Sequence, residues 1–425
     1  MEALRVALVS DWFLPRVGGV EVSIHELARG LSRRGHEVFV LTHPNSLSGA
    51  RPALDRIDDG YTVYWIPSRL HGADEVTVDP LAVVRSLLFV KRNAFDVVHS
   101  HGVTSTLGLM TAMIARGGTG IPSVLTNHSL LSDGLRDPLR RLVKYGLSWP
   151  SVLTGVSRAA ARDIEAISGR PAVVTPNCID VKAWRETSEP IDLEGEPAIV
   201  ITSRLSKRKN PLEIARVAEL VLKRLPRASF HVIGDGALGP ALRATLERRG
   251  LDGRVRLLGI RPRREIAKIL ASADFFALTS YKESFGLAVL EAMALGAVPV
   301  VYRSPGVIDL VENGVNGFVV SDPQTMAETI ASTYEDHDLY ARLSWASVKR
   351  AEIFDCGNVI SNYVEPAYSS AIEGCRESDR RFLLYRFYRT LVGDPVKVGE
   401  WCEERKWLYH ERAKEGIVPI VRRRA

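Results

Sequence analysis

The chain has 425 residues, of which 46% are hydrophobic and 25% charged, and its formal net charge is +6. At roughly 150 residues per domain this length predicts two or three domains, and the composition excludes a disordered chain. No apolar run approaches the ~20 residues of a membrane-spanning helix, and the first residues lead into a strand-like segment without a signal peptide. Four cysteines without CxxC spacing or a nearby histidine are typical of a reduced, cytoplasmic protein without structural zinc. They are Cys178, Cys356, Cys375 and Cys402.

Short apolar runs alternate with amphipathic stretches twice along the chain. Strands are predicted first at 5–11, 36–43, 62–68, 96–102, 122–129, 151–157 and 172–176, with helical patterns such as 19–34 between most of them. A polar stretch, 185–197, is interpreted as a linker. Strands then follow at 198–205, 229–234, 255–259, 274–280, 298–302 and 317–320.

Strands separated by helices indicate parallel sheets covered on both faces. The sequence therefore predicts an α/β protein with two doubly wound, Rossmann-like domains that face each other across a cleft. We place the domains at 1–190 and 191–352, followed by a crossover helix at 353–374 and a basic, aromatic-rich extension at 375–425. Ligands bind outside the carboxyl ends of the strands in such sheets, so residues just after strands are the candidates for a site.

Two glycine-rich loops follow predicted strands. Gly18 and Gly19 precede a helix, so this loop is either a tight turn with positive φ or a backbone site for phosphate. Gly234 begins a literal GxGxxG, but no carboxylate follows the next strand and the loop lies in the second domain. A nicotinamide dinucleotide is therefore rejected, and we interpret this loop as part of the cleft wall.

Arg204 and Lys209 follow the first strand of the second domain, just before a helix that starts near Pro211. Two cations at this place suit a diphosphate, whose charge they neutralise as a leaving group departs. The alternative is a solvated basic loop.

Residues 283–291, Glu-Ser-Phe-Gly-Leu-Ala-Val-Leu-Glu, follow another strand and open an apolar helix. The amides of Phe285, Gly286 and Leu287 can hold phosphate at the helix N-terminus, while carboxylates accept hydroxyls. Glu283 has the alternative of an ordinary charge at a helix start. Glu291 lies within an apolar helix, where a buried carboxylate needs partners.

His128 ends the fifth strand of the first domain on the side of the cleft, where it is either structural or catalytic. Asp336 and Asp338 resemble a metal pair, but we expect them on the solvated face of a late helix. No Asp-x-Asp site follows a strand, so no metal site is predicted.

Together and in this order, these motifs resemble the retaining glycosyltransferases of family four, in which two glutamates form an E-x7-E signature. The resemblance runs from about Val6 to Tyr368 and implies the GT-B fold, with a nucleotide-sugar in the cleft and no metal requirement. Within the family, the first domain is most similar to the phosphatidylinositol N-acetylglucosaminyltransferases. That similarity lies in residues 10–15, 18–21, 98–102 and 125–130. The chain departs from the family at Cys178, where glycine is usual.

The resemblance implies a role for each motif. Arg204 and Lys209 would bind the donor diphosphate and stabilise UDP as it leaves. Glu283 would bind hydroxyls of the donor sugar, and Glu291 the ribose hydroxyls. His128 would lie near the anomeric carbon and orient the sugar.

Backbone and base contacts complete the expected donor site. The backbone amides of Gly18, Gly19, Phe285, Gly286 and Leu287 would contact the phosphates, Gly234 would line the donor site, and Ile260 and Arg261 would flank the base. The family's usual mechanism is attack on the face that the leaving group departs from, with the leaving phosphate accepting the acceptor's proton. The two-carboxylate scheme of glycosidases is therefore not applied to the two glutamates.

Two basic segments bear on which kind of acceptor we expect. Residues 135–149 predict an amphipathic helix, which suits either an anionic membrane surface or a scaffold with a basic solvent face. Its apolar stripe is Leu135, Leu139, Leu142 and Val143, and its cations are Arg136, Arg140 and Lys144. The extension at 375–425 has 13 Lys and Arg against 8 Asp and Glu, interleaved with aromatic residues. For it we favour lipid or intramolecular packing over nucleic acid.

We therefore expect a transferase that moves a sugar, with N-acetylglucosamine the best candidate, from UDP to a hydroxyl acceptor. A phosphoinositol-type lipid at the cytoplasmic face of a membrane accounts for both basic segments. The remaining alternatives are a soluble or polysaccharide acceptor, a GT-B epimerase or phosphorylase, and an inactive nucleotide-sugar-binding subunit. The sequence does not indicate whether partner subunits are needed.

Overall fold

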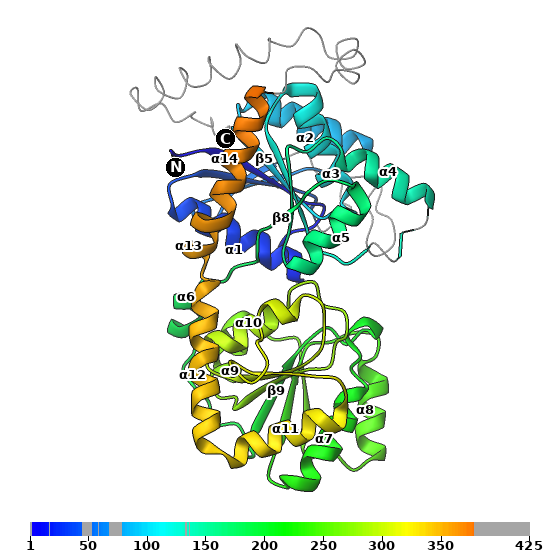
Figure 1. Cartoon of the computed structure of the whole chain (residues 1–425), viewed down its shortest axis with the longest axis vertical. Helices are drawn as coiled ribbons and strands as arrows, with labels where there is room; N and C mark the ends of the chain where they lie inside the picture. The colour runs from blue at the N-terminus through cyan, green and yellow to red at the C-terminus, as the bar shows by residue number, and fades with distance from the viewer. Residues whose placement is uncertain are drawn as a thin grey trace, which may run out of the picture.

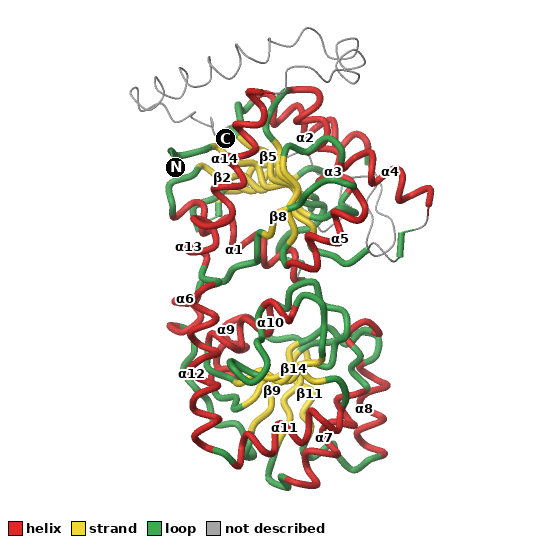
Figure 2. Tube along the Cα trace, viewed as in Figure 1, coloured by secondary structure: helices red, strands yellow, loops and turns green. Residues whose placement is uncertain are grey.

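A computed structural model describes residues 2–16, 18–44, 53–57, 59–67, 79–131, 134–135 and 137–377. Arg136, Cys402 and the predicted extension from residue 378 onward lie outside the described residues. Figure 1 shows two domains stacked along the long axis of the molecule, and Figure 2 shows strands in the middle of each domain with helices around them. The prediction of two parallel, Rossmann-like α/β domains is confirmed.

The N-terminal domain is built on an eight-stranded sheet of order β3-β4-β2-β1-β5-β6-β7-β8. Its strands are β1 (Arg5–Val9), β2 (Glu37–Thr42), β3 (Ala53–Arg56), β4 (Thr62–Trp65), β5 (Val97–His101), β6 (Ser123–Asn127), β7 (Val152–Gly155) and β8 (Val173–Val174). Neighbouring strands are parallel except β3 and β4. The short edge strand β3 is exposed throughout and was not predicted, because its residues show no alternation of buried and polar positions.

Helices cover this sheet where apolar residues recur with helical spacing. They are α1 (Gly19–Arg33), α2 (Pro80–Arg92), α3 (Thr106–Ile114), the π-helix η1 (Ala115–Thr119), α4 (Asp137–Leu147) and α5 (Arg158–Ser168). The short helix α6 (Val181–Glu186) follows at the junction of the two domains (Figure 1). In α1, Ile24, Leu27, Ala28 and Leu31 form the buried stripe that packs on the sheet.

The C-terminal domain contains a six-stranded parallel sheet of order β11-β10-β9-β12-β13-β14. Its strands are β9 (Ala198–Thr202), β10 (Ser229–Ile233), β11 (Val255–Gly259), β12 (Phe275–Leu278), β13 (Val298–Tyr302) and β14 (Phe318–Val320). Its helices are η2 (Lys207–Lys209), α7 (Glu213–Arg224), α8 (Gly239–Arg248), α9 (Arg263–Ala271), α10 (Leu287–Ala294), η3 (Val307–Asp309), α11 (Pro323–Glu335) and α12 (His337–Ile353). The strand order reverses between β9 and β12, as it does between β1 and β5, and a ligand crevice opens at such points.

After α12 the chain returns to the N-terminal domain through α13 (Cys356–Val359), the π-helix η4 (Ile360–Val364) and α14 (Glu365–Glu377) (Figure 1). Tyr368 of α14 is fully buried, and its hydroxyl lies 2.8 Å from Nδ1 of His99 in β5. The last described helix is therefore an integral part of the N-terminal domain.

The cysteines correct one expectation. Cys178 and Cys356 form a disulfide with their Cα atoms 4.8 Å apart, so the prediction of unpaired thiols is wrong for this pair. The partners lie 178 residues apart and meet only because the chain crosses between the domains twice at this place. Beside the disulfide, Ile179 and Asp355 form a parallel β-bridge. Cys178, the cysteine that departs from the family pattern, thus links the two segments in which the chain passes from one domain to the other.

The amphipathic helix α4 also differs from its expected pattern. Val143 is buried, whereas Leu139, Leu142 and Tyr145 are 50%, 63% and 54% exposed. The guanidinium of Arg140 donates to the carbonyl oxygen of Ala166 in α5, 3.0 Å away. The four apolar residues predicted on one stripe are therefore divided between the core and the surface.

Candidate active site

Arg204 lies in the loop after β9 with its side chain exposed. The adjacent amide of Leu205 donates to the carbonyl oxygen of Asp235, 2.9 Å away in the glycine-rich loop. Gly234 has a φ of +125°, and a Cβ there would lie 2.0 Å from the carbonyl oxygen of Ser203. Glycine is thus required for the two loops to pack backbone against backbone, which fixes the position of Arg204.

Lys209, at the end of η2, pairs with Glu283 from the loop after β12. Its Nζ lies 2.5 Å from Oε1 of Glu283, and both side chains are largely buried. The backbone N–H of Glu283 donates to Oγ of Ser304, and its carbonyl oxygen accepts from the N–H of Gly306. Lys209 and Glu283, which were predicted on different motifs, therefore meet. Hydrogen bonds at both the backbone N–H and the carbonyl oxygen of Glu283 hold the loop that carries its carboxylate.

Gly286 is the N-cap of α10 and has a φ of +103°, a conformation that favours glycine. No side chain caps the first turn of this helix, so its leading N–H groups, beginning at Leu287, can receive an anion. The Phe285 ring is buried against Phe354, with ring centroids 5.8 Å apart. Phe285 can therefore contribute its backbone to a ligand, while its side chain anchors the loop.

Glu291 lies in the second turn of α10. Burial of its carboxyl group raises its pKa to about 7, the positive charge of Arg263 lowers it, and the negative charge of Glu26 raises it. A carboxylate in such surroundings can accept two hydroxyl hydrogen bonds, whereas its protonated form loses one acceptor position.

His128, after β6, belongs to a buried group of imidazoles. Its Nε2 lies 3.0 Å from Nδ1 of His101, and the His101 ring stacks on that of His99 with centroids 4.3 Å apart. The two nitrogens of His99 bond to Tyr368 and Thr126. Burial lowers the pKa of His128 to about 4 and that of His101 well below its ordinary value, so both rings are neutral at pH 7. His128 is thus held in place as a neutral hydrogen-bonding group.

The loop before α1 does not form the positive-φ turn that was one interpretation of Gly18 and Gly19. Gly18 has a φ of −162°, which is extended backbone, and Gly19 is the first residue of the helix. A Cβ on Gly18 would lie 2.5 Å from Oε2 of Glu21, whose carboxylate pairs with Arg16 at 3.3 Å. Glycine at position 18 therefore leaves room for a carboxylate at the N-terminal turn of α1.

Ile260 and Arg261 follow β11 at the same end of the sheet as the other candidates. Ile260 is 73% exposed. Arg261 forms a loose ion pair with Glu265, 3.8 Å away. Both side chains are therefore accessible to a ligand.

Two contacts between the domains were not predicted from the sequence. The backbone N–H and Nε of Arg158 in α5 both donate to the carboxylate of Asp309 in η3, each at 2.6 Å. Glu26 of α1 forms an ion pair with Arg263 of α9. Glu26 carried no usable signal, because it lies on the side of α1 opposite the apolar stripe of Leu27, Ala28 and Leu31, where a charged residue is ordinary. The pair of Arg158 and Asp309 carried none either.

Among the described residues, no group of three or more His, Cys, Asp or Glu side chains is placed to hold a metal ion. Asp336 caps the N-terminus of α12 through the amide of Leu339.

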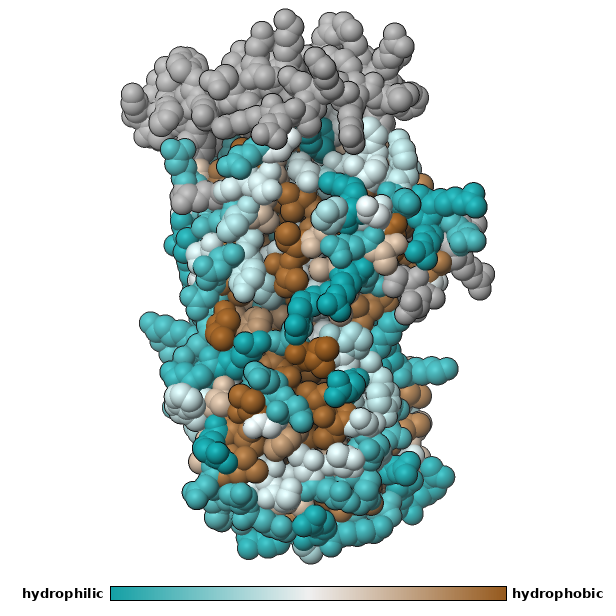
Figure 3. Space-filling model, viewed as in Figure 1, coloured by the Kyte–Doolittle hydropathy of each residue, from teal (hydrophilic) through white to brown (hydrophobic). Residues whose placement is uncertain are grey.

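The described helices include none that is both long and apolar enough to cross a bilayer. Figure 3 shows apolar side chains gathered on one face around the level where the two domains meet.

Comparisons with known proteins agree with this geometry. The family described as Glycosyltransferase Family 4 matches residues 17–183, and the family described as Glycosyl transferases group 1 matches residues 185–350. A phosphatidylinositol N-acetylglucosaminyltransferase subunit of Arabidopsis thaliana is 31% identical over 369 residues, which cover 82% of this chain and 81% of that protein. Alpha-monoglucosyldiacylglycerol synthase of Acholeplasma laidlawii is 25% identical over 387 residues, which cover 82% and 92%.

Among solved structures, HepE of Anabaena in complex with UDP and glucose has a TM-score of 0.67 at 21% identity, covering 86% of this chain and 100% of that one. This likeness supports the GT-B fold. The two sheets, the order of the motifs and the relative from Arabidopsis together place the chain in glycosyltransferase family 4, and the protein is a GT-B glycosyltransferase.

Proposed function

We propose that this glycosyltransferase moves N-acetylglucosamine from UDP-N-acetylglucosamine to a hydroxyl of an inositol phospholipid at a membrane surface, with retention of anomeric configuration. The observation that carries the proposal is the 31% identity to the phosphatidylinositol N-acetylglucosaminyltransferase of Arabidopsis thaliana, which extends over 81% of that protein. The cations, the uncapped helix and the carboxylates described above suit a nucleoside diphosphate sugar.

In the proposed donor complex, Arg204 and Lys209 neutralise the diphosphate together with the first turn of α10. Glu283, released from its pair with Lys209, accepts hydroxyls of the sugar, and Glu291 accepts those of the ribose. His128 orients the sugar as a neutral group. Ile260 and Arg261 flank the base.

The proposed step breaks the bond between the anomeric carbon and the β-phosphate oxygen. The acceptor oxygen forms its bond to the anomeric carbon on the same face, and its proton passes to the departing phosphate. The chemistry then requires stabilisation of negative charge on UDP, which the two cations supply, and no separate general base. We expect no metal requirement.

Helix α4 supports a lipid acceptor. Leu139, Leu142 and Tyr145 are exposed at a spacing of three residues, and Arg141 and Lys144 are exposed beside them. A scaffold helix with a basic solvent face has no need of two exposed leucines, whereas a helix at an anionic bilayer inserts such residues between cations that contact head groups.

The test is UDP release from a panel of UDP- and GDP-sugars, with EDTA present, with and without phosphatidylinositol vesicles. We expect turnover of UDP-N-acetylglucosamine that depends on the vesicles and is lost in Glu283→Ala. Stimulation only by soluble acceptors would refute the lipid acceptor and leave the transferase. Turnover without any acceptor would favour an epimerase, and UDP binding without turnover a regulatory subunit or a missing partner.

A second measurement isolates the membrane contact. We expect Leu139→Gln combined with Leu142→Gln to abolish co-sedimentation with phosphatidylinositol vesicles at low salt. Leu81→Gln is the matched control, because Leu81 is 56% exposed on α2 of the same domain. Equal loss in the control, or no loss in the α4 variant, would contradict the role of α4.

A further inference from the structure

A small polar cavity lies beside His128 in the N-terminal domain. It is lined by residues at the ends of β5, β6 and β8 and on helix α1, with residues of α13 and η4 completing the wall. The space open to a water molecule is about 20 Å³, which is enough to hold one. Its polar lining includes His101, His128 and Thr175.

Two buried polar atoms in this lining have no partner from the protein. His101 is 3% exposed and Thr175 is 6% exposed, and within the described ranges no group forms a hydrogen bond with Nε2 of His101 or Oγ1 of Thr175. Buried polar atoms are normally hydrogen-bonded, and a cavity of this size lined by two such atoms is where an internal water is held. The neighbouring His99 does not compete for it, because both its ring nitrogens are bonded, to Tyr368 and Thr126.

The other nitrogen of His101 connects the cavity to His128. Nδ1 of His101 lies 3.0 Å from Nε2 of His128, so one of the two rings donates a proton in this contact. Burial lowers the pKa of both rings, so both are neutral and each carries a single N–H. If the N–H of His101 is on Nε2, His128 donates from Nε2 and its own Nδ1 is a bare acceptor. If it is on Nδ1, Nδ1 of His128 carries the proton and is a donor.

The cavity determines which of these two arrangements is favoured. A buried N–H without an acceptor is less well tolerated than an acceptor without a donor, so a proton on Nε2 of His101 requires a partner inside the cavity. The effect reaches a ligand through His128, whose Nδ1 has no partner in the described part of the chain and whose ring is 8% exposed. A partner in the cavity thus favours a bare Nδ1 on His128.

We propose that an ordered water molecule occupies this cavity, accepts a hydrogen bond from Nε2 of His101 and donates one to the hydroxyl oxygen of Thr175, and so keeps Nδ1 of His128 a hydrogen-bond acceptor for the donor sugar. Thr175 is then a positioning residue, which acts on the sugar through the water and two imidazoles. The last step rests on the sugar role given to His128 in the proposed function. The water and the protonation of the two rings do not depend on it.

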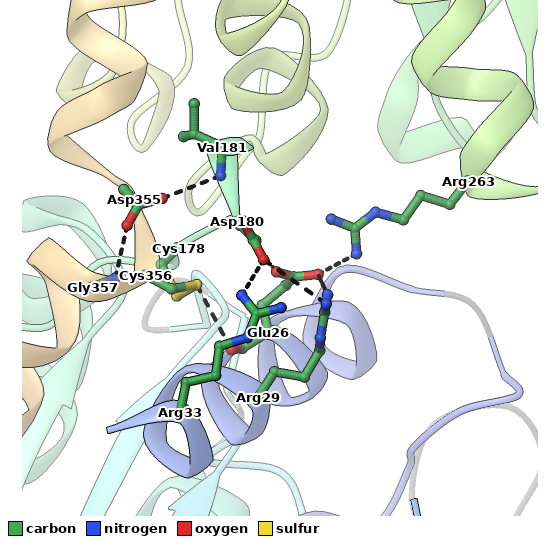
Figure 4. Close-up of a disulfide and its surroundings, with 10 residues drawn as sticks. All are labelled: Glu26, Arg29, Arg33, Cys178, Asp180, Val181, Arg263, Asp355, Cys356 and Gly357. Carbon is green, nitrogen blue, oxygen red and sulfur yellow. Dashed lines mark hydrogen bonds and ion pairs between the residues drawn. A yellow bond between two sulfur atoms is a disulfide. The ribbon is translucent and has the colours of Figure 1, made fainter. Parts of the chain in front are cut away.

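Thr175 is fixed beside the cavity by its backbone. Its N–H donates to the carbonyl oxygen of Gly155 in β7, 2.9 Å away, which continues the pairing of β7 and β8 by one residue. Three residues later, Cys178 lines the same cavity and forms the disulfide with Cys356 (Figure 4). The hydroxyl is therefore carried by a segment that is anchored on both sides.

The first measurement determines which ring nitrogen carries the proton. Nitrogen NMR of the full-length protein with isotope-labelled histidine separates protonated from bare ring nitrogens at pH 7, and His101→Gln and His128→Gln identify the two rings. In the native protein we expect the proton on Nε2 of both. A proton on Nδ1 of either ring would overturn the proposal before Thr175 is changed.

The second measurement removes the hydroxyl of Thr175 and keeps the shape of its side chain. In Thr175→Val the water loses a partner, so we expect the protons to move to Nδ1 of both rings, whereas Thr175→Ser should keep the native pattern. Thr333→Val is the matched control, because Thr333 in α11 also has a buried hydroxyl without a partner among the described residues but does not line the cavity. No switch in Thr175→Val, or an equal switch in Thr333→Val, would overturn the proposal.

Kinetics then report the effect on the sugar. Loss of one neutral hydrogen-bond acceptor should lower kcat/KM for UDP-N-acetylglucosamine about 2–10-fold in Thr175→Val, and Thr175→Ser should recover it. The dissociation constant of UDP, which lacks the sugar, should be the same in both variants. A switch of the two rings with unchanged kcat/KM would overturn the role of His128 on the sugar and leave the water in place. Weaker UDP binding in Thr175→Val would show general damage to the donor site and overturn the link to the sugar.

Discussion

Replacing Lys209 by methionine separates binding of the donor from stability of the fold. Arg204 and Lys209 have the same proposed role on the diphosphate, but they differ in what surrounds them. Lys209 is 19% exposed and pairs at 2.5 Å with Glu283, which is 9% exposed, whereas the Arg204 side chain is exposed. Loss of Lys209 therefore leaves a nearly buried carboxylate without its cation, and loss of Arg204 does not.

The expected magnitudes follow from this difference. Removing one partner of a fully buried ion pair costs about 3–5 kcal/mol, and the residual exposure of Lys209 and Glu283 reduces this to about 2–3 kcal/mol. Arg204→Met should change the free energy of unfolding by less than about 0.5 kcal/mol. Both variants should lower kcat/KM by about 10²–10³-fold, because each removes a charge that stabilises the leaving UDP.

The assays are urea denaturation followed by circular dichroism and UDP release with UDP-N-acetylglucosamine. The double variant Lys209→Met/Glu283→Gln removes the unpaired charge, so it should recover most of the lost stability and none of the lost activity. If Lys209→Met were as stable as Arg204→Met, or if the double variant remained as unstable as the single one, the carboxylate at 283 would not be the source of the cost, and the reasoning would be refuted.

Three further predictions concern the frame around the site. Joint replacement of Cys178 and Cys356 by serine should lower the free energy of unfolding by about 2–4 kcal/mol in urea denaturation without reductant, and an unchanged value would contradict a structural disulfide. Arg158→Ala should change the free energy of unfolding by less than about 1 kcal/mol, because the Arg158 side chain is 64% exposed. Asp309→Ala loses both hydrogen bonds that Arg158 donates across the domain junction, so it should increase the radius of gyration in X-ray scattering. Gly234→Ala should cost more than about 1 kcal/mol and reduce UDP affinity, because a Cβ would strike the loop that carries Arg204; an unchanged affinity would show that the two loops are independent.

The fold was predictable because its signals are local. A buried parallel strand is a continuous apolar run and its neighbouring helix has a periodic stripe, so β1 and α1 can each be located from a dozen residues. Strand β3 escaped prediction for the same reason, since its four exposed residues form no such run. The division of α4 escaped because Val143 and Leu142 are adjacent in sequence, and only tertiary packing determines which of them faces the core.

The candidate site was predictable in part. Residues that follow strands can be identified from the sequence, and Lys209 and Glu283 do meet although they come from separate motifs. Pairs whose partners belong to no motif could not be found. Cys178 and Cys356 are separated by 178 positions, and Glu26 and Arg263 by 237, so neither spacing carries information.

The links between the domains differ in kind, and the difference bears on how the enzyme would work. At the two chain crossings, a disulfide and a β-bridge between Ile179 and Asp355 hold the segments together independently of charge. The contacts of Glu26 and Asp309 with arginines across the junction are ionic. In each, the carboxylate is largely buried and the arginine is partly exposed, Arg263 at 37% and Arg158 at 64%. Salt screens both pairs, and it screens the more exposed pair of Arg158 and Asp309 more strongly. The crossings therefore act as the fixed point of any domain movement.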